Sequence, residues 1–203
     1  MIAIIDYGLG NLYSVLNMHR RLGIEAIITS DQNEIRAASK LILPGVGHFK
    51  RGMENLHQSE LKPLLDELVL QEKKPILGIC LGAQLLTEHS EEGDVNGLGW
   101  VDAVTVKFKQ DKLNGLKVPH MGWSDIAIKR GDKILSDLPA EPRFYHVHSY
   151  HFLFKESSEV IATATYGYEF ACAFQKENIY GVQFHPEKSH KYGMKLLQNF
   201  SKL

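Results

Sequence analysis

The chain has little cysteine, almost no net charge and no long apolar run. Its 203 residues include two cysteines, Cys80 and Cys172, which is too few for a disulfide-stapled secreted scaffold. Lys and Arg number 23 against 24 Asp and Glu, a formal charge of −1, so no overall field attracts nucleic acid or an anionic membrane. Every apolar run is far shorter than the ~20 residues of a membrane span. We therefore expect a soluble cytoplasmic protein with reduced thiols.

Histidine, by contrast, is abundant, with ten residues in the chain. Half of them crowd into the last third: His146, His148, His151, His185 and His190. A metal ion could join His146 and His148, which share a face of an expected strand, to His185 or His190. No His-Glu-x-x-His helix or acidic ligand motif accompanies them, and a metal would compete for the imidazole that a thiolate needs. We therefore expect no metal and no cofactor.

The first half of the chain alternates strand and helix signals. Short β-branched runs predict strands at 2–5, 24–29, 41–43 and 75–80, as in a buried parallel sheet. Apolar residues at helical spacing predict helices between and after them, at 12–22, 31–38, 49–56, 61–71 and 81–89. This rhythm favours a parallel sheet with helices on both faces.

After about Gly99 the pattern changes. Strands are predicted at 100–108, 118–128, 143–152, 160–166, 170–175 and 179–184, and a helix only at 191–200. No linker or repeat separates the two halves. The prediction is one α/β domain over residues 1–203, in which a mostly parallel central sheet flanked by helices carries an added antiparallel portion.

The strongest local signal is Gly78-Ile79-Cys80-Leu81-Gly82, at a junction of strand and helix. It is the cysteine counterpart of the Gly-x-Ser-x-Gly elbow, in which flanking glycines allow a sharp turn that projects the nucleophile. The following helix start stabilises a thiolate and offers the Leu81 amide to an oxyanion. The alternative is a buried structural cysteine, which we favour for Cys172 within its apolar strand.

A thiolate nucleophile needs a base, and His185-Pro186-Glu187 follows the predicted strand 179–184. Residues i and i+2 of an extended segment share a face, so the Glu187 carboxylate can orient the His185 imidazole. Together with Cys80 they form a Cys-His-Glu set suited to acyl transfer.

Two glycine-rich turns complete the motifs. Pro44-Gly45-Val46-Gly47 follows the strand beside the elbow and can aim an amide at a developing oxyanion, although an ordinary tight turn has the same composition. Gly8-Leu9-Gly10 lacks the third glycine of a dinucleotide fingerprint because position 13 is tyrosine, so we expect no nucleotide cofactor.

With these residues assembled, the sequence resembles the triad (class I) glutamine amidotransferases, which have a flavodoxin-like fold. The resemblance rests on Gly-Ile-Cys80-Leu-Gly-Ala-Gln84 and Phe184-His-Pro-Glu187. Segments 6–11, 43–47, 119–123, 147–150 and 184–189 resemble, more narrowly, the glutaminase subunits of imidazole glycerol phosphate synthase, a hydrolase and lyase of histidine biosynthesis.

The resemblance implies a mechanism and a substrate site. Cys80 attacks the glutamine side-chain amide, and His185, oriented by Glu187, protonates the departing ammonia and later activates water. Amides near Val46, Gly47 and Leu81 hold the oxyanion. The amino-acid end of glutamine is held by Gly47, Gln84, Glu92, Ser149 and Tyr150. Glu92 has a separate physical warrant because an α-ammonium group needs an anion; its alternative is a solvated loop carboxylate beside Glu91.

The resemblance also implies a partner. Ammonia passes through a channel into a (β/α)₈-barrel cyclase subunit, with which the chain forms a heterodimer. The docking face includes Asn11, Met121, Trp123, Tyr145 and Lys188. An exposed Trp and Met suit an interface, although packing within the antiparallel portion is an alternative for both.

Departures from the family pattern leave the ammonia acceptor open. Ser124, Ala83 and His146 stand where Asn, Met and a Phe-like residue are usual, and His151 and His190 are unusual too. Paralogous glutaminases that carry such variations supply ammonia for amination of a surface-polysaccharide sugar. A non-catalytic partner-binding subunit is the further alternative, against which the complete Cys-His-Glu set argues.

Overall fold

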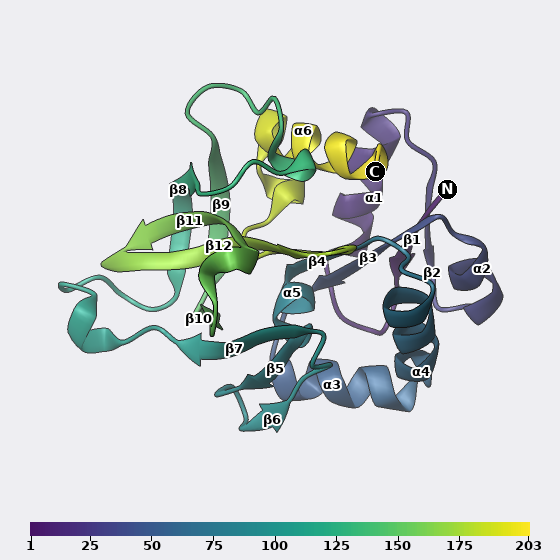
Figure 1. The fold of residues 1–203 in the computed structure, drawn as a ribbon, viewed down its shortest axis with the longest axis horizontal. Helices are drawn as coiled ribbons and strands as arrows, with labels where there is room; N and C mark the ends of the chain where they lie inside the picture. The colour runs from purple at the N-terminus through teal and green to yellow at the C-terminus, as the bar shows by residue number, and fades with distance from the viewer.

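The computed structural model describes residues 1–203 and places the expected parallel sheet at the centre of the molecule (Figure 1). Five parallel strands lie in the order β2-β1-β3-β4-β13. Their bounds are β1 Ile2–Ile5, β2 Ala26–Thr29, β3 Lys40–Gly45, β4 Ile76–Cys80 and β13 Ile179–Val182. All residues of β1, β4 and β13 are buried, as near-continuous apolar runs require when both sheet faces are covered.

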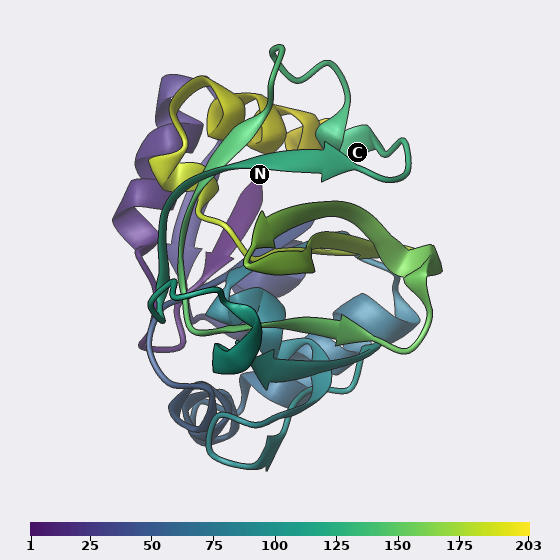
Figure 2. The same ribbon diagram turned by 90° about the vertical axis from the view of Figure 1, so that its left-hand side faces the viewer.

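Helices cover both faces of this sheet (Figure 1 and Figure 2). Ile2 and Ile4 of β1 pack in one core with α1 (Leu12–Arg21) and α6 (His190–Ser201). The alternate residues, Ala3 and Ile5, pack in a second core with α2 (Gln32–Ala37), α3 (Phe49–Gln58), α4 (Leu61–Asp66) and α5 (Leu81–Leu85). A π-helical turn, Glu67–Gln71, extends α4. No helix is both long and apolar enough to cross a membrane.

The second half adds antiparallel strands, as predicted. β12 (Tyr168–Lys176) pairs with β13, and β10 (Tyr150–Phe154) and β7 (Val101–Lys107) follow in order, each antiparallel to the strand before it. Beyond β7 lie two earlier strands, β5 (Thr87–Ser90), which pairs with β7 in parallel, and β6 (Val95–Asn96). A branch runs from β12 through β11 (Val160–Tyr166) and β8 (His120–Ile128) to β9 (Arg143–His148). Short 3₁₀ turns lie at Gln110–Lys112, Lys133–Leu135, Ser157–Glu159 and Pro186–Lys188.

Two predicted elements were wrong in extent. The helix expected at 81–89 ends at Leu85, because the β-branched Thr87 begins a strand that pairs with β7 and its hydroxyl donates to the Gln84 carbonyl at 2.8 Å. The strand expected at 143–152 is two strands that separate at Ser149. β9 pairs with β8, whereas β10 pairs with β7 and β12, so one apolar run serves two parts of the sheet.

The elbow glycines are required by close backbone approach. A Cβ on Gly82 would overlap the Leu43 carbonyl of β3, and one on Gly78 would lie 2.6 Å from the Ala83 Cα. Neither obstacle is a flexible side chain end, so β3, β4 and α5 pack this tightly only with glycine at both positions.

We therefore expect Gly82→Ala to destabilise the fold by about 3 kcal/mol or more, because the new methyl group forces backbone segments apart. For a chain of this size that corresponds to a melting temperature lower by about 6–12 °C, measured by thermal unfolding. Gly131→Ala is the matched control, since a Cβ there meets nothing within 4 Å. Equal stability of the two variants would contradict this account of the elbow.

Candidate active site

Cys80 lies at the end of β4, between β3 and β13, and adopts a strained backbone conformation. Its φ of +52° and ψ of −112° are rarely adopted by a non-glycine residue. The side chain is 7% exposed and borders a cavity above the carboxyl edge of the sheet. Strain, position and partial access together match the predicted nucleophile elbow. Cys172, in contrast, is fully buried in the core, and burial raises the pKa of its thiol, as expected for a structural cysteine.

The neighbouring strand β13 carries His185 to the same edge. Its Nδ1 lies 2.7 Å from the Glu187 Oε1, and both side chains are 1% exposed. The predicted contact is therefore formed, but the predicted extended geometry was wrong: Glu187 lies in the 3₁₀ turn Pro186–Lys188, which begins directly after His185. The His185 backbone is fixed by a hydrogen bond from its amide to the Tyr145 carbonyl and another from the Ser189 hydroxyl to its own carbonyl.

The surroundings of His185 favour a charged imidazolium. Burial works against the charge, but the neighbouring Cys80 sulfur and the Glu187 carboxylate outweigh burial and raise the pKa of His185 to about 10. Its Nε2 is buried and has no hydrogen-bond partner. The proton is thus held on His185 at neutral pH, beside the Cys80 sulfur.

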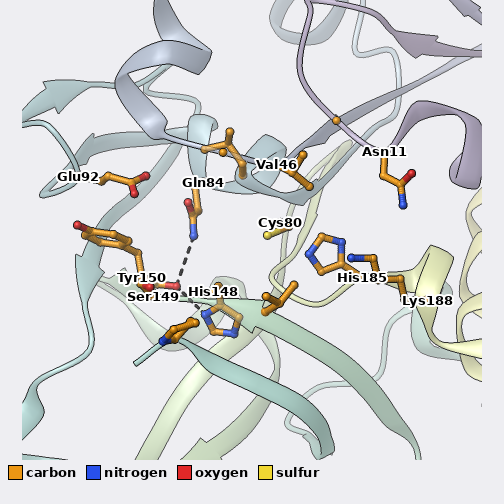
Figure 3. A pocket seen from close by; sticks show the side chains of 15 residues that line it. Asn11, Val46, Cys80, Gln84, Glu92, His148, Ser149, Tyr150, His185 and Lys188 are labelled. Carbon is orange, nitrogen blue, oxygen red and sulfur yellow. Dashed lines mark hydrogen bonds between the residues drawn. The ribbon is translucent and has the colours of Figure 1, made fainter. Parts of the chain in front are cut away.

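Residues that surround Cys80 form a cavity of about 620 Å³, which Figure 3 shows. On one side of Cys80 lie Gln84, Glu92, Ser149 and Tyr150, and on the other His185, Lys188 and Asn11. Every residue predicted for glutamine binding lines this one cavity, although these residues come from four segments of the chain. The cavity also includes Val46, Gly47, Leu81 and His148.

Glu92 is positioned by α3. One of its carboxylate oxygens accepts a hydrogen bond from the Phe49 amide at 2.8 Å, and its own amide donates to the Ser90 hydroxyl. The other carboxylate oxygen has no protein partner among the hydrogen bonds of the chain. Glu92 therefore borders the cavity as a fixed anion, in place of the solvated loop carboxylate that the sequence left open.

The glycine turn after β3 supplies free amides. Neither the Val46 nor the Gly47 amide donates a hydrogen bond within the protein, and both residues line the cavity. Gly47 has a φ of +117°, a conformation that favours glycine. The turn therefore offers donors beside Cys80, as an oxyanion site requires.

Sequence reasoning missed Gln183. Its side chain is fully buried, its Nε2 donates to the Cys80 Sγ at 3.7 Å, and its Oε1 accepts from the Gln84 Nε2 at 3.1 Å. The available signal was an amide within the apolar run 179–184, beside the elbow strand. A buried polar group needs partners, and here those partners belong to the site.

The other residues predicted for a docking face lie outside the cavity. Met121 is 63% exposed and Trp123 38% exposed, so neither is core packing. Trp123 stacks on His190 with ring centroids 5.6 Å apart, and the Lys188 Nζ lies 5.8 Å from the centre of the Tyr145 ring. An aromatic and basic surface therefore lies at the cavity rim, formed by Met121, Trp123, Tyr145 and Lys188. Lys188 also lines the cavity itself.

The late histidines separate into groups. The sets expected for a metal, His146 and His148 with His185 or His190, are not formed, since the imidazole beside His146 and His148 is that of His120. His151 is buried separately, where its Nε2 lies 2.8 Å from the Tyr168 hydroxyl. Burial lowers the pKa of His120, His146, His148 and His151, to about 4 for His120.

Because of these buried imidazoles, we expect the folded protein to lose stability as the pH falls. A histidine with a lowered pKa in the folded state adds stability above its unfolded pKa of about 6.5, and that stability is lost as the pH falls toward the folded value. For His120 the loss between pH 7.5 and 5 is about 2 kcal/mol, and its neighbours add to it. Urea unfolding at the two pH values, in buffer with a chelator, measures the loss. His146→Phe removes one titrating group and should flatten the dependence; a parent protein of equal stability at both pH values would contradict it.

Comparisons with known proteins agree on one family. The model of the family "Glutamine amidotransferase class-I" matches residues 3–203. Two curated relatives named "Imidazole glycerol phosphate synthase subunit HisH 2" are 52% identical, from Methanococcus maripaludis, and 46% identical, from Pseudomonas aeruginosa. The first covers 100% of this chain and 99% of the relative, and the second 100% of both. A subunit HisH of Bdellovibrio bacteriovorus is 44% identical over all of both chains. Among solved structures, a glutamine amidotransferase superposes with a TM-score of 0.77 at 16% identity over 100% of both chains, which shows the shared fold.

Proposed function

The chain belongs to the class-I glutamine amidotransferases, among the relatives of the HisH subunits of imidazole glycerol phosphate synthase, and we propose that it hydrolyses glutamine and delivers the ammonia to a cyclase subunit. The observation that carries the proposal is the position of Cys80, on a strained elbow beside the buried His185–Glu187 pair, at the wall of a cavity lined by the predicted substrate residues.

Glutamine fits this cavity in one direction. Its α-ammonium group pairs with Glu92, whose second oxygen is free, and its α-carboxylate and α-ammonium lie among Gln84, Ser149 and Tyr150. The side-chain amide then reaches Cys80 and His185, on the other side of the cavity. This orientation separates the end that is recognised from the end that reacts.

The reaction proceeds by acyl transfer through Cys80. The thiolate attacks the carboxamide carbon, and the oxyanion that forms accepts hydrogen bonds from amides of Val46, Gly47 and Leu81. His185 donates its Nε2 proton to the departing nitrogen, so ammonia leaves and a thioester remains. His185 then takes a proton from water, whose oxygen attacks the thioester, and glutamate and the thiolate are released.

A docked partner receives the ammonia at the His185 side of the cavity. Asn11 and Lys188 line this side, and the exposed surface of Met121, Trp123 and Tyr145 adjoins Lys188. Aromatic side chains and methionine are enriched in protein interfaces. The partner that fits the family is a (β/α)₈-barrel cyclase, which uses ammonia to form imidazole glycerol phosphate in histidine biosynthesis.

We expect Trp123→Ala to weaken binding of the cyclase subunit about 30-fold or more, because a central tryptophan typically contributes at least ~2 kcal/mol to an interface. Isothermal titration of the two subunits measures the change. Leu70→Ala is the matched control, since Leu70 is 40% exposed but lies on the π-helical turn Glu67–Gln71, which contributes no residue to the cavity. Equal affinities would remove Trp123 from the docking face.

Complementation of a histidine auxotroph that lacks this subunit tests the proposed function. Growth with the parent chain, and no growth with Cys80→Ala, would support ammonia delivery to the histidine-pathway cyclase. Failure to grow with a protein that still releases glutamate in the presence of its cognate cyclase would favour the second acceptor, a surface-polysaccharide sugar.

A specific observation keeps that acceptor open: two departures from the family pattern, Ser124 and His146, both contact His120. Absence of glutamate release with any partner would favour a non-catalytic binding subunit.

A further inference from the structure

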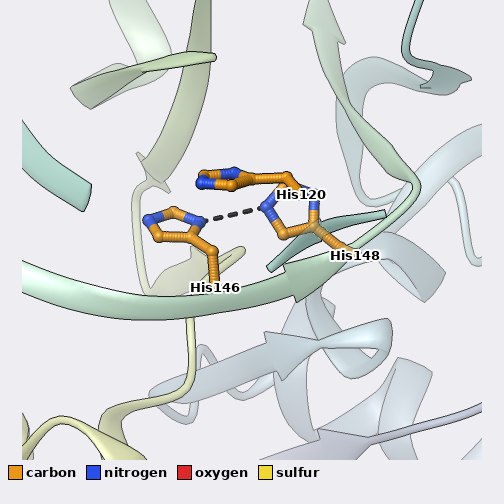
Figure 4. Close-up of side chains that lie close together, drawn as sticks. All are labelled: His120, His146 and His148. Atoms are coloured by element: carbon orange, nitrogen blue, oxygen red, sulfur yellow. Dashed lines mark hydrogen bonds between the residues drawn. The ribbon is translucent and has the colours of Figure 1, made fainter. Parts of the chain in front are cut away.

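Three buried imidazoles converge beside the glutamine cavity (Figure 4). His120 of β8 is the cross-strand partner of His148 in β9, and His146 lies two residues earlier on the same face. The three side chains are 2%, 0% and 6% exposed. One nitrogen of each lies within 4.8 Å of the others. The paired strands thus hold three candidate ligand atoms in one buried place.

The outer nitrogens of two of these rings already have oxygen partners. The Nδ1 of His148 lies 2.7 Å from the Tyr150 carbonyl and donates to it, and the Nε2 of His120 lies 2.9 Å from the Ser124 hydroxyl. Metal-binding histidines show this pattern, in which the second nitrogen is held by an oxygen while the first faces the ion. Ser124, one of the departures from the family pattern, supplies one of these partners.

Two nitrogens of the cluster lack a hydrogen-bond partner. The His120 Nδ1 and His146 Nε2 are buried without any hydrogen-bond partner, and the single bond inside the cluster joins the His146 Nδ1 to the His148 Nε2 at 3.0 Å. No carboxylate or thiol belongs to the cluster, and the rings around it are aromatic, including Phe170 and Tyr166. Such surroundings keep imidazole neutral, which is the form that binds a metal.

We propose that His120, His146 and His148 bind one divalent transition-metal ion of the Zn²⁺ type, with the fourth position left to water. At metal–nitrogen distances of about 2.0–2.1 Å, two ligands of a tetrahedral ion are about 3.3 Å apart. The 3.0 Å between His146 and His148 is already close to that separation. For His146 to bind through Nδ1, the proton that bridges the two rings moves to its Nε2.

His120 is the ligand that must move. Its ring is stacked on that of His146, with an interplanar angle of 17°, so its lone pair does not yet point between the other two. The required approach is at most about 1.5 Å, from the 4.8 Å limit of the cluster to the ligand separation of a tetrahedral site. Because His148 also lines the glutamine cavity, the ion would lie beside Cys80 without using it.

The experiment must separate this site from the active-site thiol, which also binds Zn²⁺. Untagged Cys80→Ala protein, treated with a chelator and dialysed, is titrated with Zn²⁺ and analysed by calorimetry and metal content. The expected result is one Zn²⁺ per chain. Co²⁺ in place of Zn²⁺ should give the visible absorption of a four-coordinate nitrogen site. Since the reacting thiol is absent, this result does not depend on glutaminase activity.

Single changes in the cluster identify the ligands. In the Cys80→Ala background, His146→Phe and, separately, His120→Gln should each weaken Zn²⁺ binding about 100-fold or more, whereas His190→Phe, on the surface, should leave it unchanged. His146→Phe restores an aromatic ring of the kind usual in the family, so its circular dichroism and melting curve should match those of a folded protein. No Zn²⁺ bound to Cys80→Ala, or equal binding after both cluster changes, would overturn the proposal.

Discussion

We expect Cys80→Ala to abolish glutamate release, with a kcat lower by about 10⁴- to 10⁶-fold. The change removes only the sulfur, and alanine adopts the φ of +52° about as well as cysteine does, so the elbow should keep its shape. Without a nucleophile the remaining donors can bind glutamine and stabilise an oxyanion but cannot form the thioester. Glutamate release is measured with a saturating cyclase subunit, so that the proposed complex is the species assayed.

Cys172→Ala is the matched control. Its thiol is fully buried, and burial raises the thiol pKa, so it cannot supply a thiolate. We expect unchanged kcat with a lower melting temperature, from the small void left in the core. Glutamine binding to Cys80→Ala, followed by calorimetry, shows whether the cavity is intact. Glutamate release by Cys80→Ala within tenfold of the parent would remove Cys80 from the mechanism.

The fold was predictable where local signals agree with their final neighbours. The strands β1 and β4 are apolar on both faces and could only be central parallel strands, and the elbow glycines mark a turn that no other residue permits. The errors lie where the choice of partner strand decides the structure. Nothing in the run 143–152 shows that β9 and β10 part at Ser149, because the two halves differ in their partner strands, β8 for one and β7 for the other.

The site was predictable in the same measure. Motifs located Cys80, His185 and the glycine turn, because each chemical role requires a residue type next to a strand end. The residues that contact these groups from other strands could not be predicted from motifs. Gln183 contacts Cys80 across two strands, and His120 meets His146 through the register of β8 and β9, so both depend on which strands become neighbours. The histidine sets that were weighed and set aside for a metal, His146 and His148 with His185 or His190, therefore did not include His120.

Replacement of Glu187 by glutamine should lower kcat/KM by about 10²- to 10⁴-fold while the fold remains intact. The carboxylate accepts a hydrogen bond from the His185 Nδ1 at 2.7 Å, and the Nε2 is thereby left facing Cys80. The amide of the new glutamine can instead donate a hydrogen bond to Nδ1. This stabilises the tautomer with its proton on Nε2, the nitrogen that must accept a proton in the reaction. It also removes the negative charge that stabilises the imidazolium. Glutaminase assays with the cyclase subunit present measure the loss.

A pH profile separates this role from mere packing. The pKa of His185 is raised to about 10 by Cys80 and Glu187 against the effect of burial, so the imidazolium persists through neutral pH and deprotonates near pH 10. A raised histidine pKa adds stability that is complete below about 6.5 and is lost as the pH rises to 10. In Glu187→Gln the alkaline limb of the activity profile should shift to lower pH, and the alkaline loss of stability should shrink. A profile parallel to that of the parent, merely lower, would mean that Glu187 holds the turn Pro186–Lys188 and not the charge on His185.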